Sequence, residues 1–216
     1  MDNLDLKKRE LILYWRSAFN FSEDVFLAFV KVPRENFISP ELRDLAYNDA
    51  PLPTSEHQTI SQPTTVMMML NFLDIRKDSK ILEIGCGSGY NAALISVIAE
   101  KGRIVTCEIV ESLAEKAKKN LVDYKNVEVI YGDGAQIAGE KGPFDRIIFT
   151  AAIPKVPEEL FGLLNDGGII LAPVGELYLQ EMTRVKKIGV KAGEGFTTEE
   201  LGEFVFVPMR GEWGFK

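Results

Sequence analysis

The chain has 216 residues, enough for one sizeable domain with a hydrophobic core or for a domain with an appendage. Hydrophobic residues make up 46% and charged residues 26%, and no apolar run approaches the ~20 residues of a membrane-spanning helix. The net charge of −7 argues against a nucleic-acid surface, for which a basic face is expected. Since the N-terminal residues are charged and contain no apolar signal segment, we expect a cytoplasmic protein without a membrane or nucleic-acid partner.

Cysteine and histidine are too scarce to suggest a metal site. The two cysteines, Cys86 and Cys107, lack metal-ligand spacing, and His57 is the single histidine. We therefore predict no bound metal, and we expect both cysteines to be free thiols, as is usual in the cytosol.

The N-terminal third is predicted to be helical at first and irregular afterwards. Apolar residues recur at helical spacing over 4–18 and again over 25–30, where the preceding Ser22-Glu23-Asp24 suits a helix cap and Pro33 a helix end. Residues 46–61 are rich in proline, and we predict neither helix nor strand there. Because a long loop inside a compact domain is often functional, this segment is a candidate site. An apolar helix is predicted over 64–73, with Pro63 near its start.

Strands and helices alternate through the remainder of the chain. Strands are predicted over 80–84, 103–109, 127–131, 144–150 and 169–173, helices over 91–99, 111–121 and 156–164, and a turn over 165–168. Residues 179–188 and 203–207 are strand-like without a helix between them. We predict an α/β fold with a doubly wound, mostly parallel sheet, an antiparallel element at its edge and an N-terminal helical segment. The chain is expected to form a single domain over 1–216, with 1–75 supplying helices and loop and 76–216 the core.

A glycine-rich motif lies between the first strand of the sheet and the helix that follows. Glu83, Gly85, Gly87 and Gly89 form the pattern E-x-G-x-G-x-G, and Asn91 lies in the next helix. Glycines let the backbone turn tightly and approach a ligand, while the helix N-terminus offers unpaired N–H groups. The motif resembles motif I of class I S-adenosylmethionine (SAM) methyltransferases, which implies a Rossmann-like fold with SAM as cofactor and S-adenosylhomocysteine as product. An NAD site and a glycine turn without a ligand are the alternatives.

Ligands of open α/β sheets bind beyond the carboxyl ends of the strands, so the residues at these ends are candidates. Glu108 ends the second strand about 20 residues after Gly89, the spacing at which an acid binds ribose hydroxyls. Asp133 and Gly134 follow the third strand, where the carboxylate suits an adenine amino group and the glycine allows close approach. A surface glutamate and a simple Asp-Gly turn are the plain alternatives. Small residues at 150–152 leave room for the methionine part of the cofactor.

Several longer segments carry a more specific resemblance. These are 32–37 (V-P-R-E-N-F), 46–49 and 51–53, 58–63 (Q-T-I-S-Q-P), 82–92, 131–134, 144–148, 167–168, 173–175 and 206–211 (F-V-P-M-R-G). Together they resemble the protein-L-isoaspartate (D-aspartate) O-methyltransferase family. The Q-T-I-S loop and the late F-V-P-x-R-G segment are more diagnostic than the glycine motif, which many methyltransferases share.

The resemblance implies roles for residues at both ends of the chain. Cofactor contacts are implied for the loop residues Gln58, Thr59, Ile60 and Ser61. Substrate contacts are implied for Thr59, Ser61, Val207, Pro208 and Arg210. Ser61 is implied to be the active-site residue, where its hydroxyl orients the substrate and is not a covalent nucleophile.

The implied reaction is methyl transfer from SAM to the free carboxylate of L-isoaspartyl and D-aspartyl residues in damaged proteins, after which the ester closes to a succinimide. A carboxylate is already ionised at pH 7, so no general base is needed. The chain has Thr54-Ser55-Glu56-His57 where the family is usually glycine-rich, and Thr64 and Thr65 where the family has a histidine. The alternatives are therefore methylation of another small acid or an amine, and a SAM-binding protein without activity. His57 is either a substrate contact or an ordinary loop residue.

Overall fold

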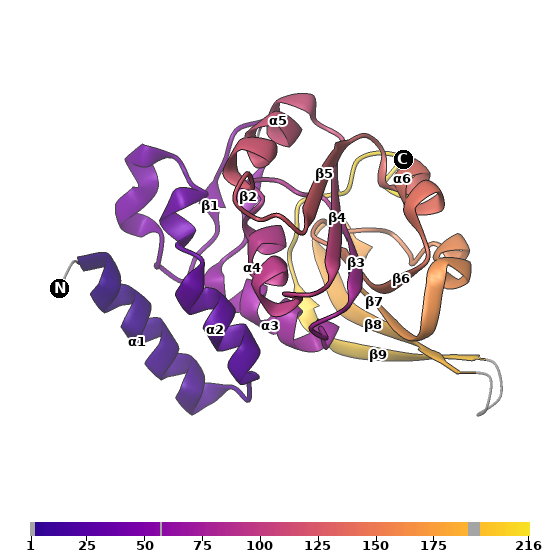
Figure 1. The fold of residues 1–216 in the computed structure, drawn as a ribbon, viewed down its shortest axis with the longest axis horizontal. Helices are drawn as coiled ribbons and strands as arrows, with labels where there is room; N and C mark the ends of the chain where they lie inside the picture. The colour runs from indigo at the N-terminus through magenta and orange to yellow at the C-terminus, as the bar shows by residue number, and fades with distance from the viewer. Residues whose placement is uncertain (1–2, 57, 190–194) are drawn as a thin grey trace.

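The structure is a computed structural model that describes residues 3–56, 58–189 and 195–216 (Figure 1). The N-terminal part comprises α1 (Asn3–Ala18), α2 (Glu23–Lys31), the 3-10 helices η1 (Arg34–Asn36) and η2 (Pro40–Leu45), β1 (Leu52–Pro53), β2 (Thr59–Ile60) and α3 (Pro63–Leu73). The remainder comprises β3 (Lys80–Ile84), α4 (Tyr90–Ile98), β4 (Arg103–Glu108), α5 (Glu111–Asn120), β5 (Val127–Tyr131), α6 (Gly134–Lys141), β6 (Phe144–Phe149), η3 (Glu158–Leu163), β7 (Leu164–Glu176), β8 (Leu179–Ile188) and β9 (Gly195–Phe204).

Seven strands form the central sheet in the order β5-β4-β3-β6-β7-β8-β9. The strands from β5 to β7 pair in parallel, whereas β8 and β9 pair antiparallel at one edge. The chain leaves β3 toward β4 on one side and later returns to β6 on the other, so neighbouring connections diverge at the end of β3. Such a point of divergence is where open α/β sheets bind ligands. The predicted fold class, with its antiparallel edge and N-terminal helices, is confirmed.

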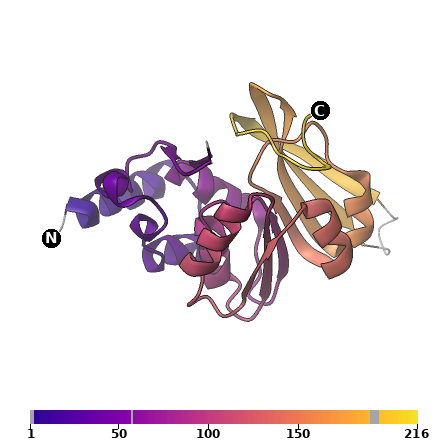
Figure 2. The same cartoon turned by 90° about the horizontal axis from the view of Figure 1, so that it is seen from above.

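Helices cover both faces of the sheet, and each face has its own hydrophobic cluster. Successive strand residues point to opposite faces, so Ile81 of β3 joins the cluster under α3 and α4 while Leu82 joins the cluster under α6 and η3. Figures 1 and 2 show α1 and α2 outside α3 and α4, as a further layer on the first face. The N-terminal segment thus shares its core with the sheet. No helix in the described part of the chain is long and apolar enough to cross a membrane.

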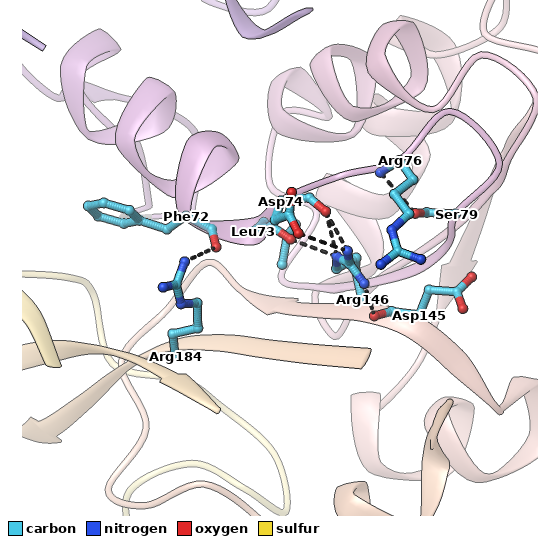
Figure 3. A network of polar contacts seen from close by, with 8 residues as sticks. All are labelled: Phe72, Leu73, Asp74, Arg76, Ser79, Asp145, Arg146 and Arg184. Carbon is cyan, nitrogen blue, oxygen red and sulfur yellow. Dashed lines mark hydrogen bonds and ion pairs between the residues drawn. The ribbon is translucent and has the colours of Figure 1, made fainter. Parts of the chain in front are cut away.

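A buried arginine of β6 connects the sheet to the C-terminal end of α3 (Figure 3). Arg146 of β6 is 1% exposed, and its Nε donates to the carbonyl of Leu73 at 2.7 Å. Its Nη2 donates to the carbonyl of Asp74 at 2.5 Å. Arg184 of β8 similarly donates to the carbonyl of Phe72 at 3.3 Å. Carbonyls at a helix end lack partners within the helix, so these guanidinium groups satisfy them.

Several predictions of secondary structure are wrong. The helix expected over 156–164 is the shorter 3-10 helix η3 over 158–163, and the strand expected over 169–173 is β7 over 164–176. The helix α6 was missed, because its eight residues bury little apolar surface and contain two glycines, which weakens the helical pattern. The last strand is β9 at 195–204 and not 203–207, because β9 is mostly exposed and polar and so lacks the alternation that marks a strand. Residues 165–168 form an irregularity inside β7 and not a separate turn.

The proline-rich loop contains a short ladder that the sequence did not predict. Leu52 pairs with Ile60 and Pro53 with Thr59 in antiparallel register. Both apolar members of this ladder, Leu52 and Ile60, are buried, so the loop is fastened to the core at its two ends. The expectation of a wholly irregular segment over 46–61 is therefore wrong, and the loop has a defined position.

Candidate active site

The turn between β3 and α4 consists of alternating glycines in the left-handed region. The angle φ is +98° at Gly85, +53° at Gly87 and +86° at Gly89, values that L side chains rarely adopt. The N–H groups of Gly85 and Cys86 both donate to the carbonyl of Cys107, at 3.0 and 2.9 Å, and so fasten the turn to β4. The glycine turn therefore lies fixed over the ends of two adjacent strands.

Glu108 is held beside this turn by backbone hydrogen bonds. Its Oε2 accepts from the N–H of Gly87 at 2.9 Å, and its Oε1 accepts from the N–H of Val110 at 3.0 Å. The residue is 8% exposed and lines the pocket above the sheet. Each carboxylate oxygen can accept more than one hydrogen bond, so both oxygens retain capacity for a ligand. The arrangement suits a pair of neighbouring hydroxyl groups.

One pocket spans the carboxyl ends of β3, β4, β5 and β6 and gathers most of the predicted site residues. Those that line it are Gln58, Thr59, Ile60, Ser61, Gly85, Gly87, Asn91, Glu108, Gly134, Val207, Pro208 and Arg210. Three predicted residues, Glu83, Gly89 and Asp133, lie outside its lining. His57 lies outside the described residues. Segments from residues 58–61 and 207–210, far apart in sequence, thus share one cavity with the glycine turn.

Glu83 lies behind the glycine turn and not in the pocket. It is 0% exposed, and its carboxylate accepts from Asn91 Nδ2 at 2.7 Å and from Thr106 Oγ1 at 2.5 Å. Burial raises the pKa of Glu83 to about 7, against the lowering effect of these two donors, and the nearby Glu108 adds to the rise. The acid of the motif therefore positions Asn91, which does line the pocket.

The Glu83→Gln variant is expected to gain stability relative to wild type as the pH rises. Because the folded state holds this proton up to about pH 7, wild type loses stability between the ordinary carboxyl pKa and about 7. Glutamine has no such proton, so the difference in unfolding free energy should shift by about 2 to 3 kcal/mol in the variant's favour from pH 5 to pH 8. Urea unfolding of both proteins at pH 5 and pH 8 measures this shift. If the difference in unfolding free energy between variant and wild type were the same at both pH values, the raised pKa of Glu83 would be contradicted.

The loop that ends at Ser61 is anchored where α3 begins. Asp49 Oδ1 accepts from the N–H of Thr64 at 2.9 Å, and Asp49 Oδ2 accepts from Thr64 Oγ1 at 2.6 Å. Trp15 Nε1 in turn donates to Thr64 Oγ1 at 2.7 Å. Thr64 stands near the position where the family has a histidine, and here its hydroxyl connects α1 to the start of α3. The departure from the family pattern thus has a structural role.

Glu56 connects the same loop to α5. Its backbone has φ +60°, the left-handed region, which is unfavourable for a residue with a Cβ. Its Oε1 accepts from Ser112 Oγ on α5 at 3.1 Å. The neighbouring Gln58 and the residues just before α5, Ile109 and Val110, line the pocket. The hydrogen bond therefore joins the loop to the rim of the cavity.

The segment after β9 forms the opposite wall. The carbonyl of Val207 accepts from the N–H of Ala152 at 2.9 Å, and the N–H of Met209 donates to the carbonyl of Ala152 at 2.8 Å. Asp133 holds the continuation of this segment, since its Oδ2 accepts from the N–H of Glu212 at 2.8 Å. Asp133 Oδ1 also accepts from the N–H of Ala135, which caps α6. Its role toward adenine stays a prediction.

Several pocket residues were not predicted from the sequence. They are Val66, Met69, Ile84, Cys86, Ser88, Tyr90, Cys107, Ile109, Val110, Gly132 and Met209. Ile109 and Val110 directly follow Glu108, so their position beyond a strand end was a usable signal. Thr150 and Ala151, expected to leave room for a methionine group, also line the pocket. Both cysteines are free and buried, and no group of three His, Cys, Asp or Glu side chains in the described ranges is arranged to hold a metal.

Comparison with known proteins identifies the family of this chain. The family model for protein-L-isoaspartate(D-aspartate) O-methyltransferase (PCMT) matches residues 6–213. A protein-L-isoaspartate O-methyltransferase of Staphylothermus marinus is 42% identical over 222 residues, which cover 97% of this chain and 96% of the relative. Another, of Methanococcus maripaludis, is 45% identical over 196 residues, which cover 89% of this chain and 90% of the relative.

A solved structure agrees with the fold. A Plasmodium falciparum protein assigned to the same family, crystallised with S-adenosyl-L-homocysteine, superposes with a TM-score of 0.79 at 24% identity and covers 96% of this chain and 98% of its own. The family match over residues 6–213 and the two relatives confirm the resemblance seen in the Q-T-I-S and F-V-P-x-R-G segments over nearly the whole sequence. The chain belongs to the protein-L-isoaspartate(D-aspartate) O-methyltransferase family.

Proposed function

We propose that this chain transfers a methyl group from SAM to the free carboxylate of L-isoaspartyl and D-aspartyl residues in damaged proteins, which starts their repair. The observation that carries the proposal is the shared pocket. The glycine turn and Glu108 lie in the same cavity as the loop 58–61 and the segment 207–210. Membership of the family, whose relatives bear the name of this activity, supports the choice of acceptor.

The residues of the pocket fit SAM. Glu108 has free lone pairs for the ribose hydroxyls, and the apolar Ile109 and Val110 suit the adenine ring. Asn91 Oδ1 is buried without a hydrogen-bond partner in the described structure, and it lines the pocket near the glycine turn. A buried acceptor of this kind is suited to the ammonium group of the methionine part. The bound S-adenosyl-L-homocysteine of the Plasmodium relative supports the same cofactor class.

The chain's own residues would position the acceptor and exclude water. SAM supplies an activated methyl group on a sulfonium. Ser61 lines the pocket, and its hydroxyl would donate a hydrogen bond to the substrate carboxylate. Thr59, Val207, Pro208 and Arg210 would hold the peptide around it. Since the carboxylate is ionised at pH 7, the residues need to orient it and to exclude water, and none has to remove a proton.

A matched pair of peptides tests the proposed acceptor. Methyl transfer from radiolabelled SAM is expected to an isoaspartyl peptide and not to its aspartyl twin of the same sequence, because only the first presents its free carboxylate one carbon closer to the kinked backbone. Equal transfer to both, or transfer only to small acids or amines, would contradict the repair function. Binding of S-adenosylhomocysteine by calorimetry without any transfer would favour a SAM-binding protein.

The remaining expectations from composition stay predictions. We propose that the chain works as one domain in the cytoplasm and that its macromolecular partners are isoaspartyl-containing peptides and proteins. The net charge of −7 supports the absence of a nucleic-acid partner. The hydrophobic core shared by α1–α3 and the sheet supports the single domain.

A further inference from the structure

A fully buried cation lies directly behind the active-site loop. Arg34, the first residue of η1, is 0% exposed. Its Nε donates to the carbonyl of Ala46 at 2.9 Å, and its Nη2 donates to the carbonyl of Ser61 at 2.7 Å. Its Nη1 has no partner within the described structure. The loop residue implied to act on the substrate is therefore held at its carbonyl by a side chain that lies 27 positions earlier in sequence.

The same guanidinium group also touches the cofactor half of the pocket. It lies over the ring of Tyr90, 5.1 Å from the centroid, and Tyr90 is the first residue of α4 after the glycine turn. Tyr90 lines the pocket and its hydroxyl is buried without a partner in the described residues. Arg34 thus contacts both the element that follows the glycine turn and the loop that lines the same pocket.

No ion pair explains why a charge is buried at this position. Among the described residues, no carboxylate lies within ion-pair distance of Arg34. Burying a charge without an ion-pair contact is costly, and burial lowers the pKa of Arg34 against the opposing attraction of Tyr90, Tyr47 and Asp49. The compensation comes from two carbonyls and one aromatic face, and both the Ser61 carbonyl and the Tyr90 ring belong to pocket residues. Two of these three contacts of the cation are therefore made with pocket residues, and the third is made with Ala46.

We infer that Arg34 is a positioning residue for methyl transfer, which holds the Ser61 carbonyl and thereby fixes the Ser61 hydroxyl relative to the glycine turn. The inference rests on the proposed function. Asp49 and Trp15 fix the chain three residues after Ser61, at Thr64, and Arg34 supplies the fixed point at Ser61 itself. Without it the ladder from β1 to β2 is the nearest remaining anchor. A small displacement of Ser61 would then misalign the acceptor oxygen.

A second buried arginine provides a matched control. Arg146 is 1% exposed and also donates to backbone carbonyls, those of Leu73 and Asp74, but it does so away from the pocket (Figure 3). Arg34→Lys and Arg146→Lys each keep the charge and remove the fork of donors. Both are expected to lower the melting temperature. Only Arg34→Lys is expected to affect the reaction, because only Arg34 contacts the loop.

The experiment compares turnover, cofactor affinity and loop protection in these variants. Arg34→Met is expected to lower kcat for an isoaspartyl peptide by about 10- to 100-fold, with the Kd of S-adenosylhomocysteine within about threefold of wild type. Arg34→Lys should recover part of kcat, and Arg146→Lys should keep kcat within about threefold. Hydrogen exchange in the S-adenosylhomocysteine complex should rise over residues 58–61 in the Arg34 variants alone.

Each outcome decides between positioning and general stability. Equal kcat losses in Arg34→Lys and Arg146→Lys at equal melting temperatures would overturn the inference, as would loss of cofactor affinity in parallel with kcat. If Arg34→Met does not fold, Arg34→Lys carries the comparison. If wild type transfers no methyl group to the isoaspartyl peptide, the proposed function fails, and the hydrogen-exchange comparison still tests whether Arg34 holds the loop.

Discussion

Glu108→Ala is expected to weaken the binding of S-adenosylhomocysteine by about 100-fold. The carboxylate is the proposed acceptor for two ribose hydroxyls. Each hydrogen bond to a charged group contributes about 1.5 kcal/mol or more to the binding free energy. The side chain is already held by the N–H groups of Gly87 and Val110, so the ligand meets an ordered carboxylate. Titration calorimetry with S-adenosylhomocysteine measures the change. Turnover at low SAM should fall in proportion.

Two variants separate this effect from a general loss of structure. Glu108→Gln keeps the shape and one acceptor, and should fall between wild type and the alanine variant. Glu128→Ala removes a carboxylate from the adjacent strand β5, where Glu128 pairs with Lys141 and Arg103 outside the pocket. It should leave the Kd unchanged. A Kd for Glu108→Ala within about threefold of wild type, less than 1 kcal/mol, would contradict ribose binding by this residue.

Ser61→Ala is expected to lower kcat for the isoaspartyl peptide by about 10- to 100-fold while the affinity for S-adenosylhomocysteine stays within about threefold. The variant keeps the carbonyl that Arg34 binds, so the loop should retain its position and only the hydroxyl is lost. Steady-state kinetics with varied peptide, together with calorimetry, separates the two quantities. Equal losses of turnover and cofactor affinity would argue against an orienting role.

Ser55→Ala is the control for this measurement, since it removes a hydroxyl from the same loop. Ser55 is exposed and does not line the pocket. Its backbone carbonyl, which accepts from the N–H of Gln58, remains in the variant. Kinetics equal to wild type are expected. A loss as large as that of Ser61→Ala would indicate that turnover depends on the loop as a whole and not on the Ser61 hydroxyl.

The parallel strands β3 to β6 were predictable because each is a short stretch rich in apolar residues, whereas the predicted 169–173 covers only part of β7. The run from Lys80 to Ile84 is buried on both faces, so Ile81, Leu82 and Ile84 make it apolar apart from the acid Glu83, and its bounds agree with the structure. The helix α6 was not predictable in the same way. Its Asp133 cap is a local signal for a helix start, but the eight residues that follow carry a weak helical pattern, and the packing against η3 is not visible in local residue spacing.

The acidic residues of the site show a related limit of prediction from the sequence. Glu83, Glu108 and Asp133 all stand at or next to the carboxyl end of a parallel strand, but only Glu108 lines the pocket. Glu83 faces Asn91 and Thr106, and Asp133 faces backbone N–H groups. Spacing along the chain locates an acid at the end of a strand, but the direction of its side chain depends on partners from other elements. Arg34 was missed for the same reason, since its contact with Ser61 depends on tertiary packing.

The left-handed conformation of Glu56 affects the stability of the loop. A residue with a Cβ in this region carries about 1 to 2 kcal/mol of unfavourable energy that glycine does not. This energy is present while Glu56 holds the left-handed conformation beside α5. Relative to a chain with glycine at position 56, the observed conformation of the loop is raised in free energy by that amount. The departure from the glycine-rich family pattern thus has an energetic cost at position 56, next to the hydrogen bond that Ser112 donates to Glu56.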